Sequence, residues 1–290
     1  MSKDKNELPR IGAHKSIANG IDKAIVRGIK STCECLQIFT RPPRRWEAKL
    51  LTHDEKQVID FLDKAEKADY FETAIHMPYL PNISSPENAL YQKSITILKE
   101  EVIKSNLLCA PYVISHLGSP KLKSRTFAVN RVAKALNFVL DTQFGNSTIL
   151  LENSTGKKRN WGKTIEDIAD VIEKVDHPQY VGMCFDTAHA YASGYDISFP
   201  ETLHEVFDSI DDLLGKNEVR IIHLNDSKGE LDSGIDRHEH IGKGNIGLDC
   251  FQELMQHPRF KNISMILETP EDELIDDKAN LELLRSLRKK

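Results

Sequence analysis

The chain has 290 residues, 40% hydrophobic and 29% charged, a balance that supports a sizeable core and excludes a disordered protein. No run approaches the roughly 18 apolar residues of a membrane span, and the N-terminal segment lacks the apolar centre of a signal peptide, so we expect a cytoplasmic protein without a membrane partner. The overall net charge of −5 argues against a nucleic-acid partner. Basic residues nevertheless gather at 41–46 and 156–163, which is compatible with one basic rim on an acidic protein.

Eight short apolar runs rich in β-branched residues alternate with longer stretches of 3.6-residue periodicity, a rhythm typical of repeated βα units. Eight is the strand number of a TIM (β/α)8 barrel, which usually needs roughly 250 residues. We therefore predict an α/β protein whose residues 1–290 form a single barrel domain with elaborated βα loops and a core from about 10 to 288. An open doubly wound sheet is the alternative, but no G-x-G-x-x-G follows the first run. The predicted strands are 10–14, 35–40, 73–76, 112–116, 148–152, 181–186, 219–223 and 264–268.

Helices are predicted between these strands. Thr52, followed three residues later by Glu55, predicts a capping box at the start of the first of them. No proline-rich or serine-rich linker divides the chain, and no repeat appears beyond the βα rhythm. The predicted helices include 54–67, 88–107, 125–139, 164–174, 202–214 and 277–287.

The five cysteines are an odd number in a chain without an export signal, so we expect reduced thiols. Cys33 and Cys35 form a C-x-C within an apolar run, a spacing that suits one face of a strand better than a metal knuckle. We interpret them as buried thiols.

Six successive apolar runs each end in a histidine or an acidic residue. In a (β/α)8 barrel the C-terminal ends of the strands surround the active site, so these six side chains would converge on one bowl. A single such residue is more often a hydrogen-bonded structural group. Six together would repel one another or stay desolvated unless bound cations compensated them. The six residues are His76, His116, Glu152, Asp186, His223 and Glu268.

Two short spacings add further candidate ligands. His189 follows Asp186 by three residues, and Asp236 and His238 lie two apart, on one side of an extended segment. Nine candidates are too many for one tetrahedral zinc and suit a cluster, and their nitrogen and oxygen donors favour Zn²⁺ or Mn²⁺ without ranking the two. His14, which ends the first run, either supports the same bowl or hydrogen-bonds a neighbouring strand.

Motifs spread from about residue 11 to residue 268 resemble the endonuclease IV family of apurinic/apyrimidinic endonucleases (AP endonuclease family 2). They read IGAHKS, FTRPPRRW, HMPYL, SHLGS, LENSTG, CFDTAHAYASGYD, HLNDSK, DRHEHIGKGNIG and LETP. The resemblance implies three divalent ions, Zn²⁺ with Mn²⁺ as the alternative at one site. The first site would be held by His76, His116 and Glu152. Glu152 would bridge to a second site completed by Asp186, His223 and Glu268, and the third would be held by His189, Asp236 and His238.

The same resemblance implies a DNA-repair enzyme, a deoxyribonuclease IV acting as a monomer on double-stranded DNA. It would hydrolyse the phosphodiester 5′ to an abasic site, leaving a 3′-hydroxyl and a 5′-deoxyribose phosphate, and would also trim blocked 3′ ends. Glu268 and Glu152 are the expected catalytic residues, with Glu268 orienting or deprotonating the attacking water. Arg44, Tyr79 and Leu80 would press into the minor groove and turn out the abasic sugar, which costs least to extrude because it has lost its stacking and pairing.

Two other functions remain as alternatives. A sugar isomerase or epimerase could share the barrel and bind divalent ions, but it needs neither the set of His189, Asp236 and His238 nor the basic loops. A damage-binding or metal-dependent regulatory protein without turnover would not need open metal sites that activate water.

Overall fold

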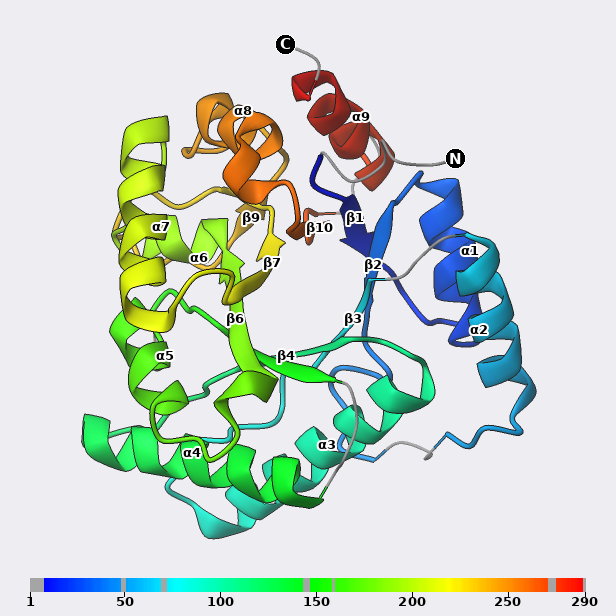
Figure 1. Cartoon of the computed structure of the whole chain (residues 1–290), viewed down its shortest axis with the longest axis vertical. Helices are drawn as coiled ribbons and strands as arrows, with labels where there is room; N and C mark the ends of the chain where they lie inside the picture. The colour runs from blue at the N-terminus through cyan, green and yellow to red at the C-terminus, as the bar shows by residue number, and fades with distance from the viewer. Residues whose placement is uncertain are drawn as a thin grey trace.

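Eight parallel strands close into a barrel in the order β1, β10, β7, β6, β5, β4, β3, β2, with helices around it (Figure 1). The computed structural model describes residues 8–47, 51–68, 72–142, 147–157, 160–270 and 275–288. The barrel confirms the predicted fold class. Its strands are β1 (Ile11–His14), β2 (Cys35–Ile38), β3 (Thr73–His76), β4 (Tyr112–His116), β5 (Thr148–Glu152), β6 (Val181–Asp186), β7 (Val219–His223) and β10 (Ser264–Leu267).

Strands β3 to β7 have the predicted bounds, whereas β1, β2 and β10 are shorter than predicted. At β10 the difference has a clear cause. The backbone N–H of Glu268 donates to the side-chain oxygen of Asn225 at 2.8 Å instead of joining the strand ladder. At β2 the chain leaves the sheet after Ile38, because Thr40 and Arg41 turn to bind Glu101 on helix α3 (Asn88–Leu107).

The helices of the described ranges cover the outside of the barrel (Figure 1). Three short helices were not predicted from the sequence: α1 (Asp22–Lys30), α6 (Thr187–Ala192) and α8 (Leu248–Gln256). A two-stranded antiparallel pair, β8 (Asp226–Ser227) with β9 (His238–Glu239), lies beyond the barrel strands. The helices are α1 (Asp22–Lys30), α2 (Lys56–Lys67), α3 (Asn88–Leu107), α4 (Arg125–Thr142), α5 (Ile165–Ile172), α6 (Thr187–Ala192), α7 (Pro200–Leu214), α8 (Leu248–Gln256) and α9 (Asp277–Leu287).

The predicted capping box at Thr52 is wrong. The Thr52 hydroxyl donates to Asp54 at 2.6 Å, and only the reverse half of the box forms, with the Thr52 N–H donating to the Glu55 carboxylate at 3.2 Å. Helix α2 consequently begins at Lys56, two residues later than predicted. A complete capping box forms instead at α5, where Thr164 and Asp167 each accept a backbone N–H from the other.

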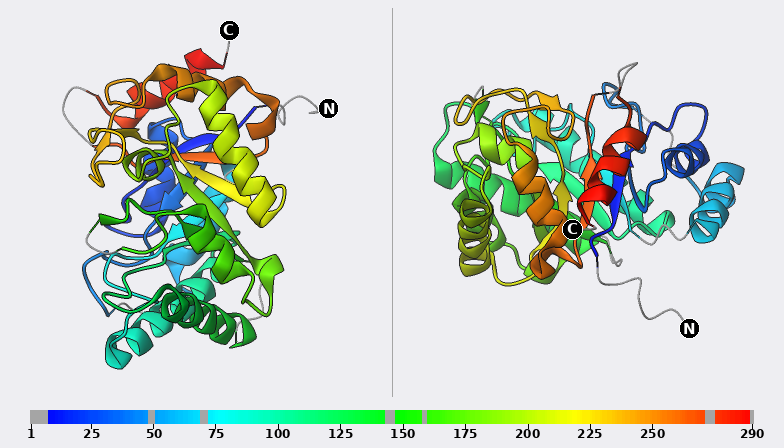
Figure 2. Two further views of the ribbon diagram at one scale, coloured as in Figure 1. Left: turned by 90° about the vertical axis from the view of Figure 1, so that its left-hand side faces the viewer. Right: turned by 90° about the horizontal axis from the view of Figure 1, so that it is seen from above.

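Alternate residues of each strand face the barrel interior, where a compact apolar layer fills the space between the strands. The larger hydrophobic core lies between the strands and the helices. Helix α9 packs beside β1 and joins the last element to the first, as Figure 2 shows, and a buried ion pair between Lys15 and Asp277 ties the two segments together. The interior apolar layer consists of Cys35, Ala74, Ile114, Leu150, Cys184, Ile221 and Ile266.

Among the described helices, none is long and apolar enough to span a bilayer.

Candidate metal centre

A layer of polar side chains lies directly beyond the apolar layer of the barrel interior. Because side chains of a strand alternate between its two faces, the residue two positions after each interior apolar residue also points inward. Leu150 is therefore followed by Glu152, and Ile221 by His223. Each of the eight barrel strands supplies one such residue within one position of its end. They are His14, Gln37, His76, His116, Glu152, Asp186, His223 and Glu268.

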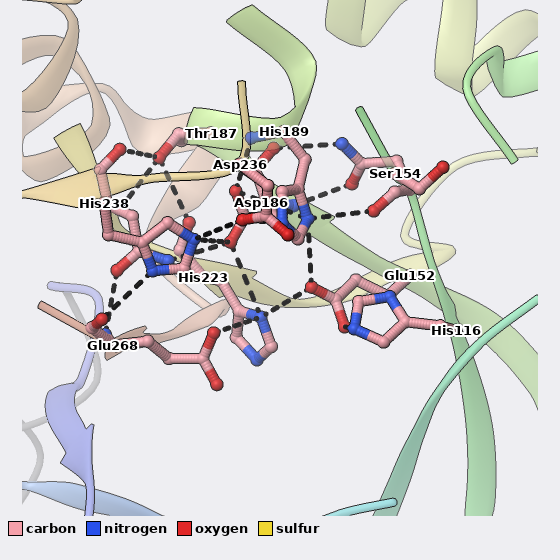
Figure 3. A network of polar contacts seen from close by, with 12 residues as sticks. His116, Glu152, Ser154, Asp186, Thr187, His189, His223, Asp236, His238 and Glu268 are labelled. Atoms are coloured by element: carbon pink, nitrogen blue, oxygen red, sulfur yellow. Dashed lines mark hydrogen bonds and ion pairs between the residues drawn. The ribbon is translucent and has the colours of Figure 1, made fainter. Parts of the chain in front are cut away.

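Glu152 is buried at the centre of this layer and contacts four histidines, of which Figure 3 labels His116, His189 and His223. Its Oε2 lies 3.1 Å from His76 Nε2 and 3.4 Å from His116 Nε2. Its Oε1 lies 3.2 Å from His223 Nδ1 and 3.3 Å from His189 Nδ1. One carboxylate therefore faces two separate groups of imidazoles, an arrangement suited to a bridging ligand.

A second group of carboxylates surrounds His223. Its Nδ1 lies 3.4 Å from Glu268 Oε2 and 3.8 Å from Asp186 Oδ2, in addition to its contact with Glu152. One ligand atom from each of these four residues lies within 4.8 Å of the others. Three carboxylates held so closely around one imidazole need positive charge to balance them.

The third group lies where α6 meets the loop before β9. One ligand atom each from Asp186, His189 and His238 lies within 4.8 Å of the others. Asp236 stands at the edge of this group, with its side chain 59% exposed and its Oδ1 3.3 Å from His189 Nε2 and 3.8 Å from His238 Nε2. The structure thus brings all nine predicted ligands to one end of the barrel, with Asp236 the most exposed of the carboxylates.

Two of the histidines, His76 and His238, are oriented for ligation by a hydrogen bond from the second ring nitrogen. His76 Nδ1 donates to the carbonyl of Met77 at 2.7 Å, and His238 Nδ1 donates to the carbonyl of Glu268 at 3.0 Å. Each bond leaves Nε2 with its lone pair directed into the cluster. His238 Nε2 is buried and has no hydrogen-bond partner, which is the state expected of a nitrogen placed to bind a cation.

Charge within the cluster shifts the pKa values of its members strongly. Burial alone would raise the pKa of Glu152, but His116 and His223 hold it well below its ordinary value. The pKa of Glu268 falls to about 2 because His223 and His76 outweigh the effect of burial. Burial opposes protonation of His223, yet the surrounding groups raise its pKa well above 6.5. Without a cation the carboxylates therefore draw protons onto histidines, and cation binding would release them.

Sequence reasoning missed three residues that hold this layer in place. Gln37 is fully buried and contacts His14, His223 and Glu268, and its signal was its position two residues after Cys35 on β2. Asn225 donates to Asp186 Oδ2 at 2.8 Å, and Asn153 accepts the backbone N–H of Asp186 at 2.7 Å. His14 belongs to the same network, because its Nδ1 lies 2.9 Å from the amide nitrogen of Gln37.

The residues predicted to contact DNA lie beside the polar layer. Arg44 and Tyr79 are exposed and Leu80 is half-buried. Tyr79 joins the two loops, since its N–H donates to the carbonyl of Pro43 at 3.2 Å and its ring packs 5.4 Å from Phe39. A cavity of about 380 Å³ opens next to them and reaches the cluster. Its walls include Tyr79, Leu80, His116, Trp161, His189 and Asp236.

The prediction of a basic rim is wrong for Arg41. Arg41 is only 1% exposed, because its guanidinium binds Glu101 at 2.6 Å and Glu100 at 2.5 Å. Arg44 and Arg45, in contrast, are exposed. In the second basic segment Lys157 is exposed and Lys163 pairs with Asp232, while 158–159 lie outside the described residues.

No cysteine belongs to the sets of ligand atoms found among the described residues. All five are free thiols, and all except Cys109 are buried. Burial raises the pKa of Cys184 to about 12 and that of Cys33 to about 11, so neither is a thiolate at neutral pH. Cys33 and Cys35 are buried thiols, as interpreted from the sequence.

Comparison with known proteins agrees with this geometry. Residues 30–290 match the family described as xylose isomerase-like TIM barrel. A probable endonuclease 4 of Methanoculleus marisnigri is 38% identical over 96% of this chain and 98% of its own length. That of Nitrosopumilus maritimus is 36% identical over 94% and 97%.

Comparison with solved structures distinguishes a relative of the same family from a protein that shares only the fold. Endonuclease IV of Thermus thermophilus superimposes with a TM-score of 0.84 at 32% identity, over 96% of this chain and 98% of that one. A D-tagatose 3-epimerase-like protein reaches a TM-score of 0.71 at 17% identity, over 96% of each chain, a likeness that shows the barrel fold alone. These matches show that the chain belongs to the endonuclease IV family of nucleases, which is built on the xylose isomerase-like TIM barrel.

Proposed function

We propose that this nuclease repairs double-stranded DNA by hydrolysing the phosphodiester 5′ to abasic sites, leaving a 3′-hydroxyl and a 5′-deoxyribose phosphate, and that it removes blocking groups from 3′ ends. The observation that carries the proposal is Glu152, whose two oxygens face different imidazole groups at 3.1–3.4 Å. The relatives named endonuclease 4 support a DNA substrate. The chain would act as a monomeric single domain.

Three divalent ions would be held here, Zn²⁺ with Mn²⁺ as the alternative at one position. When bound, such ions lower the pKa of water and neutralise charge on a phosphate. They would also more than cancel the net charge of −5 and would place the positive charge at the barrel mouth, where DNA binds. The holding residues would be His76 and His116 for the first ion, Asp186, His223 and Glu268 for the second, and His189, Asp236 and His238 for the third, with Glu152 shared by the first two.

Glu268 would orient the attacking water or take its proton. Its Oε1 accepts a hydrogen bond from Gln37 at 2.6 Å, and its Oε2 faces His223 at 3.4 Å, so the carboxylate is held in one direction. A pKa of about 2 keeps it ionised at neutral pH and ready to accept a proton or a hydrogen bond. Glu152 would fix the spacing between the two imidazole groups.

Arg44, Tyr79 and Leu80 would enter the minor groove at the lesion. Tyr79 and Leu80 line the cavity of about 380 Å³ that leads to His116 and His189, and Arg44 is exposed next to Pro43, whose carbonyl accepts the Tyr79 N–H. An abasic sugar lacks stacking and pairing, so it needs the least energy to leave the helix and enter such a cavity.

The proposal is tested with a fluorescent duplex that carries one abasic site, incubated with the zinc-loaded protein. We expect a single cut on the 5′ side of the lesion, a 3′-hydroxyl that a polymerase extends, and loss of cutting after chelation. An intact duplex of the same sequence is the control. Absence of cutting by protein whose zinc content has been verified would contradict the proposal, and turnover of a ketose by that protein would support an epimerase instead.

A further inference from the structure

A second group of potential metal ligands lies away from the barrel mouth. Within the described ranges, five sets of side chains bring their ligand atoms within 4.8 Å of one another, and four of these sets are drawn from the centre around Glu152 and its neighbours. The fifth comprises His204, Glu253 and His257. His204 is on α7, Glu253 is on α8, and His257 directly follows α8. Both helices belong to the outer ring around the barrel (Figure 1).

The three side chains are held close together by the contact between the two helices. His204 Nε2 lies 2.8 Å from Glu253 Oε1, and the imidazole rings of His204 and His257 have centroids 4.4 Å apart. His257 is fixed at the end of α8, because its N–H donates to the carbonyl of Glu253 at 2.9 Å. The three potential ligands therefore come from α7 and from the C-terminal end of α8, two helices that pack against each other.

The surroundings favour a cation at this position. The side chains of His204 and Glu253 are 26% and 23% exposed, so they are partly desolvated while His257 is open to solvent. Buried Phe260 stacks against the His204 ring at 6.0 Å and closes one side. The C-terminal end of α8 contributes negative potential. The nearby cation Arg259 is balanced by Asp208 at 2.6 Å and Asp211 at 2.7 Å.

We propose that His204, Glu253 and His257 bind one divalent transition-metal ion, which joins α7 to α8 independently of the centre at the barrel mouth. Two imidazoles and one carboxylate form the nitrogen and oxygen donor set that Zn²⁺, Ni²⁺ and Cu²⁺ prefer, and water would complete the coordination. Metal ligation through His257 would replace the present bond in which its Nδ1 accepts the Arg259 N–H at 3.2 Å. The site stabilises the fold rather than acting on DNA.

The experiment measures zinc content and thermal unfolding of the full chain in a buffer of fixed micromolar free zinc. His257→Ala is the first variant, because its side chain is exposed and its bond to the Arg259 N–H caps only the short 3-10 turn Pro258–Phe260, and His204→Gln is the second. We expect each variant to lose one equivalent of zinc per chain while its incision activity stays unchanged. Added zinc should raise the Tm of the wild type by about 2–4 °C and should not raise that of the variants by as much.

The matched control is His177→Ala, which removes a half-exposed histidine that pairs with the single carboxylate of Asp141 at 3.3 Å. It should retain the full zinc content and the full Tm response. Equal zinc content and equal response in the wild type, His257→Ala and His204→Gln would overturn the proposal. The outcome is independent of the proposed activity, because zinc content and Tm are read without DNA.

Discussion

His223 Nε2 donates a hydrogen bond to the side-chain oxygen of Gln37 at 2.8 Å, and this bond decides which nitrogen of His223 faces the carboxylates. With Nε2 bonded to Gln37, Nδ1 faces Glu152 and Glu268 at 3.2 and 3.4 Å, and the Nδ1 proton is the one that a cation would displace. The amide of Gln37 also donates to Glu268 Oε1 at 2.6 Å. One buried amide therefore orients two predicted ligands of the same cation.

Replacing Gln37 should weaken metal binding. Gln37→Met keeps the volume of the side chain but removes its hydrogen bonds to His223, Glu268 and His14, so we expect zinc affinity to fall about 10–100-fold, as is usual when the partner of a ligand is lost. Competition with a chromophoric chelator measures the affinity. Thr73→Val is the control, because the Thr73 hydroxyl is buried on the neighbouring strand without a hydrogen-bond partner. Equal affinity in Gln37→Met and Thr73→Val would show that Gln37 does not orient the ligands.

Replacing Glu268 should stop incision while leaving the fold intact. Glu268→Gln removes the negative charge that faces His223 but retains the shape of the side chain. We expect the single-turnover rate on an abasic duplex to fall at least about 100-fold. Circular dichroism and zinc content check folding and metal loading of the same sample. Full activity in this variant would remove Glu268 from the handling of water.

The two exposed wedge residues should affect DNA recognition more than metal content. We expect Arg44→Ala and Tyr79→Ala each to weaken binding to an abasic duplex by about tenfold, or roughly 1.4 kcal/mol, with unchanged zinc. Arg45→Ala is the matched control, because it removes the same charge from an adjacent exposed position. It should weaken binding to abasic and intact duplexes alike. If Arg44→Ala gave the same uniform loss, the wedge assignment would be wrong.

Arg41 should matter for stability rather than for binding. Its buried guanidinium pairs with Glu101, which is itself fully buried, and its Nη1 donates to the carbonyl of Trp46 at 3.0 Å. Arg41→Ala would leave buried carboxylate charge with fewer partners, so we expect the free energy of unfolding to fall by about 3–5 kcal/mol. Urea unfolding measures this change. Arg45→Ala should change it by less than about 0.5 kcal/mol, and a similar small change in Arg41→Ala would contradict the prediction.

His14 should make stability depend on pH between about 6.5 and 4. Burial lowers the pKa of His14 to about 4, against the opposing charge of Glu268. The unfolded chain therefore takes up this proton first. The stabilising contribution is fully present above pH 6.5 and is lost as the pH falls toward 4.

The test compares the wild type with His14→Gln, whose amide does not titrate. The difference between their free energies of unfolding should decrease by roughly 2–3 kcal/mol from pH 7.5 to pH 4. Bound cations near His14 would lower its pKa further and leave the direction unchanged. A difference that stays constant over this range would mean that His14 titrates normally.

The sequence by itself determined the barrel and the position of its polar residues. Strand periodicity is local, so Leu150 and Glu152 had to share a face wherever the strand lay, and the same rule held for Ile221 and His223. Eight such strands have a common direction in a barrel, and their ends must meet. This is why the predicted ligands could be placed together from the sequence, without any knowledge of long-range contacts.

Only the tertiary structure decided which groups support those residues. Gln37 reaches His223 across 186 positions of sequence, and Arg41 is buried because Glu101 lies 60 positions away, although the sequence placed it on an exposed rim. His204 meets Glu253 only where α7 packs on α8. Such pairs depend on which elements the closed barrel brings side by side, and a local pattern of hydrophobicity and charge does not name a partner so distant in the sequence.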